Sequence, residues 1–108
     1  TNKSEFTIGY FTKHGDSGVD MMPIADFAKE DIYKLAKHLS IPEEIILKKP
    51  SAGLWENQTD EDEMKMSYEE LDNFIMRNEG EEDIINRIEK MFVNSEHKRN
   101  YPRIFKKA

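Results

Sequence analysis

The sequence predicts a mainly helical chain with at most one short strand. Apolar residues recur at helical spacing in several segments, whereas only residues 19–24 resemble a short buried strand. Pro23 lies inside that run and restricts it to the edge or the end of a sheet, because proline has no backbone N–H to donate. A chain of 108 residues without an internal repeat can build one hydrophobic core, so we expect residues 1–108 to belong to a single domain.

Apolar residues at helical spacing predict a first amphipathic helix that begins after Asp26, a candidate N-cap. The apolar positions are Ala28, Ile32, Leu35, Ala36 and Leu39. Proline suits a first helical position, so Pro42 predicts the start of a short second helix that runs to about Leu47. Pro50 and Gly53 are expected to end it.

Ser67 and Glu70 have the spacing of a capping box, in which each side chain accepts a hydrogen bond from the other residue's backbone N–H. They predict the start of a third helix, whose apolar face consists of Leu71, Phe74 and Ile75. A further amphipathic helix is expected after Gly80, within a carboxy-terminal helix and tail that covers residues 81–108. Its apolar positions are Ile84, Ile88, Met91 and Phe92.

Residues 48–66 form a long connection between the second and third predicted helices. Connections of this length tend to be lids or disordered segments, which makes this one a candidate lid. The lone Trp55 has two interpretations of equal weight, because it can cover a ligand or pack into the core. The acidic run from Asp60 to Glu63 lacks the alternating ligands and the turn glycine of an EF-hand, which argues against calcium.

Composition excludes several classes of function. The net charge of −6 argues against a nucleic-acid surface, which would need a basic excess. The absence of cysteine removes disulfides, thiolate metal sites and cysteine nucleophiles, and it suits a reducing compartment. No apolar run approaches the roughly 20 residues that span a bilayer. We therefore expect a soluble, cytoplasmic protein that binds neither nucleic acid nor a membrane.

Residues 9–20 are the richest segment for ligand binding. Their glycines allow backbone amides to approach an anion, and Lys13 adds a positive charge that suits phosphate. Asp16 and Asp20 offer acceptors for hydroxyl or amine groups. On pattern alone, an ordinary surface loop is the commoner interpretation of such a glycine-rich segment.

Lys29, Glu5 and the basic segment 97–99 each have a functional and a structural interpretation. Lys29 starts the first predicted helix, where an ammonium group and free helix amides can hold a phosphate, or it is a solvated lysine. Glu5 suits Mg²⁺, which takes one or two carboxylates and fills its shell with water and substrate phosphates, or it is an ordinary polar residue. Residues 97–99 either stabilise a helix C-terminus or bind phosphate or carboxylate. No set of nucleophile, base and orienting group can be assembled.

Several linked motifs together closely resemble the ammonia-dependent NAD⁺ synthetase family. Their order and gaps match over nearly the whole chain, which makes the combination far more specific than any one loop. The motifs are Asn2-Lys3-Ser4-Glu5, Gly9-Tyr10-Phe11-Thr12-Lys13, Gly15-Asp16-Ser17-Gly18-Val19-Asp20, Pro23-Ile24-Ala25-Asp26, Lys49-Pro50-Ser51-Ala52, Leu54-Trp55, Gln58-Thr59-Asp60-Glu61 and Glu96-His97-Lys98-Arg99. The resemblance implies that the chain is the carboxy-terminal part of a three-layer α/β protein with the fold of the adenine nucleotide α-hydrolases.

The activity implied by the resemblance is that of an ATP-dependent amide ligase. In this family, ATP adenylates the nicotinate carboxylate of deamido-NAD and ammonia displaces AMP, which gives NAD⁺, AMP and pyrophosphate. Mg²⁺ is the implied cofactor and ATP the co-substrate. A homodimer is also implied, with the dinucleotide near the subunit boundary. The acidic segment 56–72 and the basic segment 96–107 are consistent with contacts between subunits.

The family's functional positions carry over residue by residue. Glu5 resembles the magnesium ligand, and Asp16 resembles an acid near the ammonia position. The positions that resemble ATP-site residues are Lys29 and Ser51. The positions that resemble deamido-NAD contacts are Lys13, Asp20, His97 and Lys98.

The chain also departs from the family. Ser51 replaces a common threonine and keeps the hydroxyl, while Ser17 replaces a usual glycine and restricts the loop if that position needs a positive φ. The Ser-Gly-Gly-x-Asp-Ser loop that grips pyrophosphate in this family is absent, so we expect the 108-residue chain to be inactive alone. Two alternatives stay open: a non-catalytic helical binding module, and part of a glutamine-dependent NAD⁺ synthetase with an added amidase domain.

Overall fold

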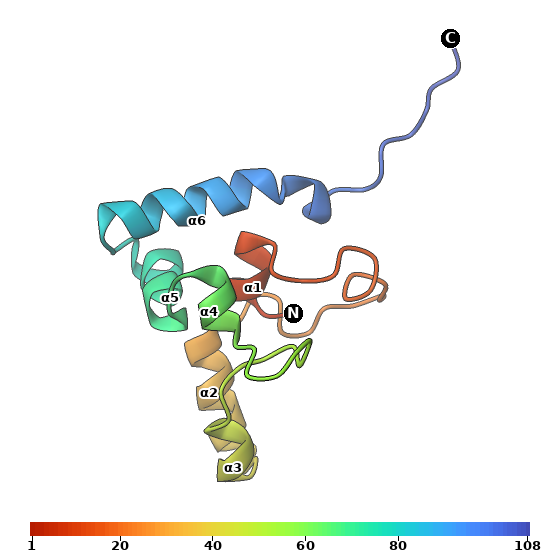
Figure 1. The fold of residues 1–108 in the computed structure, drawn as a ribbon. Helices are drawn as coiled ribbons and strands as arrows, with labels where there is room; N and C mark the ends of the chain where they lie inside the picture. The colour runs from red at the N-terminus through yellow and green to blue at the C-terminus, as the bar shows by residue number, and fades with distance from the viewer.

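The computed structural model describes residues 1–108 and contains six α-helices, one short 3₁₀ helix and no strand, as the sequence led us to expect for a mainly helical chain. The elements are α1 (Lys3–Ile8), α2 (Lys29–His38), α3 (Glu43–Ile46), α4 (Asp60–Met64), α5 (Tyr68–Arg77), α6 (Glu82–Asn94) and η1 (Glu96–Arg99). Helices α1, α4 and α5 lie at the centre, α6 crosses one side, and α2 and α3 extend away on the other (Figure 1). None of the helices has the length and apolar character needed to cross a membrane.

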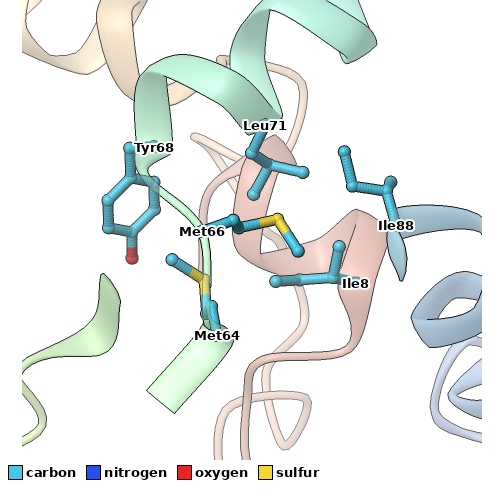
Figure 2. Close-up of a cluster of buried hydrophobic side chains, with 6 residues drawn as sticks. All are labelled: Ile8, Met64, Met66, Tyr68, Leu71 and Ile88. Carbon is cyan, nitrogen blue, oxygen red and sulfur yellow. The ribbon is translucent and has the colours of Figure 1, made fainter. Parts of the chain in front are cut away.

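The hydrophobic core lies where α1, α5 and α6 meet the segment around α4 (Figure 2). Its six members are Ile8, Met64, Met66, Tyr68, Leu71 and Ile88. Burying a side chain of this size stabilises the fold by about 1.5–3 kcal/mol. The core is small, since only 15 of 108 residues are buried. Helices α2 and α3 contribute no buried residue to it, so their placement depends on polar contacts at the start of α2.

Helix α1 begins at a capping box that we did not predict. Asn2 Oδ1 accepts a hydrogen bond from the Glu5 backbone N–H, and Glu5 Oε2 accepts one from the Asn2 N–H, both at 3.0 Å. The helix ends at Gly9, whose φ of 73° lies in the left-handed region that favours glycine. A Cβ at this position would lie 2.1 Å from Ser95 Cβ. Gly9 therefore permits a close approach between α1 and the end of α6.

Asp26 is not the N-cap of α2, so that prediction is wrong. Ala28 occupies the cap position, and its backbone N–H donates to Asp31 Oδ2 at 3.2 Å. Asp26 forms a surface ion pair with Lys3 instead, with its side chain 93% exposed. An alanine has no capping side chain, so the remaining amides of the first turn need acceptors from elsewhere in the chain.

Those acceptors come from α1 and α5. The Lys29 backbone N–H donates to Ser4 Oγ at 2.9 Å, and the Glu30 N–H donates to Asp72 Oδ2 at 2.8 Å. Ser4 Oγ in turn donates to Asp72 Oδ1. Ser4 and Asp72 are both buried, so the start of α2 is attached to the core by a shielded polar cluster. This cap fixes the residue that carries the first candidate site, Lys29.

The other predicted helices form close to their expected ranges. Ser67 and Glu70 make both bonds of the predicted capping box at the start of α5. Residues 19–24 form turns and bends, because the chain offers no neighbouring strand for them to pair with, and Val19 is 54% exposed. The candidate lid, residues 48–66, contains the short helix α4, which we did not predict. Trp55 is 58% exposed, so packing into this core is excluded as its role.

Candidate functional site

Lys29 lies at the centre of the first candidate site. Its Nζ is 3.7 Å from Glu5 Oε1 and 4.7 Å from the centroid of the Tyr68 ring. The side chains of Lys29 and Glu5 are only 16% and 19% exposed, so this ion pair is less screened by water than a surface pair. The structure thus places the predicted ATP-site lysine beside the predicted magnesium ligand.

A cleft of about 290 Å³ opens beside Lys29, where α2, α3 and the first residues of the segment 48–66 meet. Ser51, the other predicted ATP-site residue, lines the same cleft. The apolar wall consists of Ile32, Tyr33, Ala36, Ile45, Ile46 and Pro50. Lys48 and Lys49 add two more ammonium groups to the lining. An apolar wall next to clustered cations suits a ligand that carries both a ring and phosphates.

The backbone amides at the start of α2 do not supply the anion site that the functional interpretation of Lys29 would need. The N–H groups of Lys29 and Glu30 already donate to Ser4 and Asp72. A phosphate at this helix end would have to displace buried acceptors, one of them a carboxylate. Lys29 can therefore offer an anion its side-chain ammonium but not its backbone amide.

A chain of hydrogen bonds connects Ser51 in the cleft to Tyr10 and to helix α4. Ser51 Oγ donates to Gln58 Oε1 at 2.9 Å, and Gln58 Nε2 donates to Tyr10 Oη at 3.1 Å. Tyr10 donates to the Glu63 carboxylate, and Tyr68 Oη donates to Asp60 Oδ2 at 2.8 Å. The contacts of Tyr10 with Gln58 and Glu63 join segments far apart in the sequence, so residue spacing did not identify these pairs.

Both phenols in this network remain protonated. Burial raises the pKa of Tyr68 far above its usual value, and the negative charge of Glu5 and the hydrogen bond to Asp60 add to this. Burial also raises the pKa of Tyr10, with a further contribution from its hydrogen bond to Glu63. Each phenol therefore acts as a hydrogen-bond donor to a carboxylate of α4 and carries no charge near the cleft.

Glu5 can offer Mg²⁺ one bond and no closed cage. Its Oε1 accepts from Asn2 Nδ2 at 3.0 Å, lies 3.2 Å from Tyr68 Oη and faces Lys29, which uses the lone pairs of that oxygen. Its Oε2 accepts only from the Asn2 N–H, so one lone pair is left. No group of three or more histidine, cysteine, aspartate or glutamate side chains is arranged to hold a metal ion. The donor set fits a magnesium ion that is held mainly by substrate phosphates and water.

A second candidate site lies between the segment 9–20 and η1. Two adjoining pockets, of about 390 and 550 Å³, share Lys13 in their linings. Lys98 lines the first and His97 the second. Ser17 Oγ, also in the lining of the first pocket, is buried without a hydrogen-bond partner. Three of the four predicted dinucleotide contacts are thus brought together, whereas Asp20 lies outside both linings.

Lys98 and Arg99 hold α1 and the loop that follows it. Lys98 Nζ donates to the carbonyl oxygens of Gly9 at 2.7 Å and Phe11 at 2.8 Å. Arg99 donates to the carbonyls of Phe6 and Thr7, each at 3.1 Å, near the C-terminus of α1. Arg99 therefore meets the negative end of α1, and it also donates to the Phe92 carbonyl in the last turn of α6. This residue thus has a structural role, and the sequence pattern alone did not distinguish it from its neighbours in this respect.

Two loop residues have local roles in this structure. Asp16 Oδ2 accepts a hydrogen bond from the Thr12 backbone N–H at 2.7 Å, which closes the turn of residues 12–16. Ser17 has no positive φ, so the replacement of glycine by serine does not strain the loop.

Comparison with known proteins matches the arrangement to one family. The family model described as NAD synthase matches residues 1–102. The NH(3)-dependent NAD(+) synthetase of Finegoldia magna is 52% identical over 107 residues, which cover 97% of this chain and 43% of the relative. That of Syntrophomonas wolfei is 50% identical over 102 residues, which cover 94% of this chain and 41% of the relative.

A solved structure shares the fold. The NMN synthetase from Francisella tularensis is 39% identical, with a TM-score of 0.91 over 96% of this chain and 44% of that protein. The chain thus spans about two fifths of the length of its curated relatives. The residues that line the cleft and the two pockets all fall within the matched range 1–102, apart from Arg103. The chain belongs to the NAD synthase family.

Proposed function

We propose that this chain forms part of a ligase that amidates deamido-NAD to NAD⁺. ATP would adenylate the nicotinate carboxylate, ammonia would displace AMP, and pyrophosphate would be the other product. The observation that carries the proposal is that Lys29 and Ser51, which lie far apart in the sequence, line one cationic cleft, with Glu5 Oε1 3.7 Å from Lys29 Nζ. Adenylation concentrates negative charge on phosphate oxygens, and clustered ammonium groups stabilise such charge.

The cleft beside Lys29 is the proposed ATP subsite. Lys29 Nζ makes no hydrogen bond, because its nearest carboxylate oxygen, Glu5 Oε1, is 3.7 Å away. Its N–H groups are therefore available to phosphate oxygens. Ser51 Oγ lines the same space and offers a hydroxyl to the nucleotide. Mg²⁺, bound through the free lone pair of Glu5 Oε2, would neutralise the phosphate charge that the lysines do not reach.

The two pockets around Lys13 are the proposed deamido-NAD subsite. Lys13 and His97 present cationic or hydrogen-bonding groups to them, and Ser17 Oγ has an unused hydrogen bond. Lys98 uses two donors on backbone carbonyls, which leaves it one N–H for the dinucleotide. Asp20, on the exposed side of the same loop, would reach the dinucleotide only at the rim.

An ammonium ion must lose a proton before its nitrogen can attack, so the site needs a group that accepts this proton or orients the ammonia. We assign this role to Asp16. One of its oxygens holds the Thr12 N–H, while the residue itself is exposed and keeps free lone pairs. Residues 48–66 would shield the acyl-adenylate from water, since they border the ATP cleft and carry the exposed Trp55. The protein would act as a cytoplasmic homodimer, and the 108-residue chain alone would be inactive.

The test is a product assay on the full-length protein that carries this sequence. Incubation with deamido-NAD, ATP, Mg²⁺ and ammonium should yield NAD⁺ and AMP in equal amounts, and no product from intact, folded protein would refute the proposal. Nicotinate mononucleotide should be tried in parallel, because the solved neighbour is an NMN synthetase. Replacing ammonium with glutamine tests the alternative nitrogen donor.

Lys29→Ala is the matching substitution. It should raise the apparent KM for ATP at least about tenfold, as expected for a lost contact with a charged phosphate. Lys34→Ala on the same helix is the control, because Lys34 is 70% exposed and pairs only with Glu30 and Asp31. Equal kinetics for the two variants would contradict the assignment of Lys29. A wild-type protein that binds ATP but gives no turnover would favour the alternative of a non-catalytic binding module.

A further inference from the structure

Tyr68 joins three segments that carry the proposed ATP subsite. It is the first residue of α5 and is 5% exposed. Its hydroxyl meets Asp60 of the candidate lid at 2.8 Å and lies 3.2 Å from Glu5 Oε1. Its ring lies 4.7 Å from Lys29 Nζ. Tyr68 therefore connects helix α4, Glu5 and Lys29 through two polar contacts and one cation–π contact.

The Tyr68 hydroxyl lies closer to the Asp60 carboxylate than to the Glu5 carboxylate. A phenol has one hydrogen, and the shorter distance directs it to Asp60. Glu5 Oε1 is the longer second acceptor. Asp60 is 6% exposed, so its carboxylate depends on buried donors, and Tyr68 is the nearest of them. Loss of this hydroxyl would leave a buried carboxylate short of a donor.

The ring restrains Lys29 without using its hydrogen bonds. An ammonium group and a carboxylate that face each other freely would close to hydrogen-bond distance, near 2.7–2.9 Å. Lys29 Nζ stays 3.7 Å from Glu5 Oε1, and the Tyr68 ring, at 4.7 Å, attracts it more closely than the Tyr33 ring at 6.0 Å. The ammonium is therefore held in place with its N–H groups still free for a ligand.

We propose that Tyr68 is a positioning residue for nucleotide binding, and this inference rests on the proposed function. Its hydroxyl fixes the lid helix α4 through Asp60, and its ring holds Lys29 away from Glu5. Tyr68 does not face the cleft itself, because it is absent from the cleft lining, so it acts through these neighbours. If Tyr68 only packed in the core, phenylalanine could replace it without loss of nucleotide binding. If it positions Asp60 and Lys29, nucleotide binding needs its hydroxyl.

The experiment compares Tyr68→Phe, Tyr68→Leu and Ile88→Val in the full-length protein. Phenylalanine keeps the ring and removes the hydroxyl, and leucine removes both. Ile88→Val is the stability control, since Ile88 belongs to the same core cluster and has no polar contact with the site. Apparent KM values for ATP and deamido-NAD are measured separately, together with ATP affinity by calorimetry and the melting temperature.

We expect Tyr68→Phe to raise both the KM and the Kd for ATP about fivefold to tenfold, which matches the loss of one hydrogen bond to a charged group. The KM for deamido-NAD should change less than about twofold. Tyr68→Leu should weaken ATP binding further, and Ile88→Val should leave both KM values unchanged. Wild-type turnover combined with an unchanged ATP affinity in Tyr68→Phe would overturn the inference and leave the proposed function intact. An equal rise in both KM values would also overturn it.

Discussion

Replacing Asp72 by asparagine tests whether α2 is held by a cap that comes from α5. The Asp72 carboxylate is 3% exposed and accepts from Ser4 Oγ at 2.5 Å and from the Glu30 N–H at 2.8 Å. An amide has one oxygen, which would stay on the Glu30 N–H. Its NH₂ would then face Ser4 Oγ, which already accepts from the Lys29 N–H, and the hydroxyl hydrogen would lose its acceptor.

The magnitude follows from these lost contacts. One hydrogen bond to a buried charge is worth about 1.5–3 kcal/mol, and the bond that remains weakens when the charge is removed. The neutral amide offsets part of this, because a carboxylate is costly to bury. We therefore expect Asp72→Asn to lower the free energy of unfolding by about 2 kcal/mol.

Urea denaturation followed by circular dichroism measures this difference. Asp26→Asn is the matched control, because it makes the same chemical change at a carboxylate that is 93% exposed, and it should shift stability by less than about 0.5 kcal/mol. A loss in Asp72→Asn no larger than in the control would refute the view that Asp72 caps α2. The same variant should also weaken ATP binding, since Lys29 starts the helix that the cap fixes.

Two further predictions concern the backbone and pH. Gly9→Ala should destabilise the fold by more than about 3 kcal/mol, because its φ is 73° and a new Cβ would lie 2.1 Å from Ser95 Cβ. Gly53→Ala, with a φ of 66° but no atom within 4 Å, should cost about 1–2 kcal/mol, and equal melting temperatures would contradict the steric argument. Stability should also fall as pH rises above about 10, because the unfolded chain releases protons there that folded Tyr10 and Tyr68 retain. Urea midpoints across this range should fall less steeply in Tyr68→Phe.

Local sequence signals predicted the helices whose caps and apolar faces lie within one segment. The Ser67 capping box and the buried positions Leu71 and Ile88 are where periodicity placed them. The prediction of Asp26 as the N-cap is wrong, because the amides of Lys29 and Glu30 donate to Ser4 and Asp72 on other helices instead. A capping interaction between distant segments has no short-range sequence signature, so spacing arguments cannot find it.

The candidate site divides in the same way. The roles of Glu5, Lys29 and Ser51 were predicted from motif resemblance. Their contacts with Tyr68 and Gln58 were not, because no motif identified these pairs as neighbours. The interpretation of the α2 start as an anion site formed by free helix amides is wrong for a related reason. A free helix N-terminus is a property of tertiary structure, and in this chain buried acceptors already occupy it.

The basic residues near the C-terminus show how this affects functional assignment. His97, Lys98 and Arg99 are equivalent as a charge cluster, yet Lys98 and Arg99 donate to carbonyls of α1 and of the loop after it. His97 makes no such bond and lines a pocket with Lys13. A substitution at Lys98 would therefore act on the proposed dinucleotide subsite largely by moving the loop that carries Lys13. Loss of affinity in a Lys98 variant is consequently evidence for a ligand contact only if the loop is shown to stay in place.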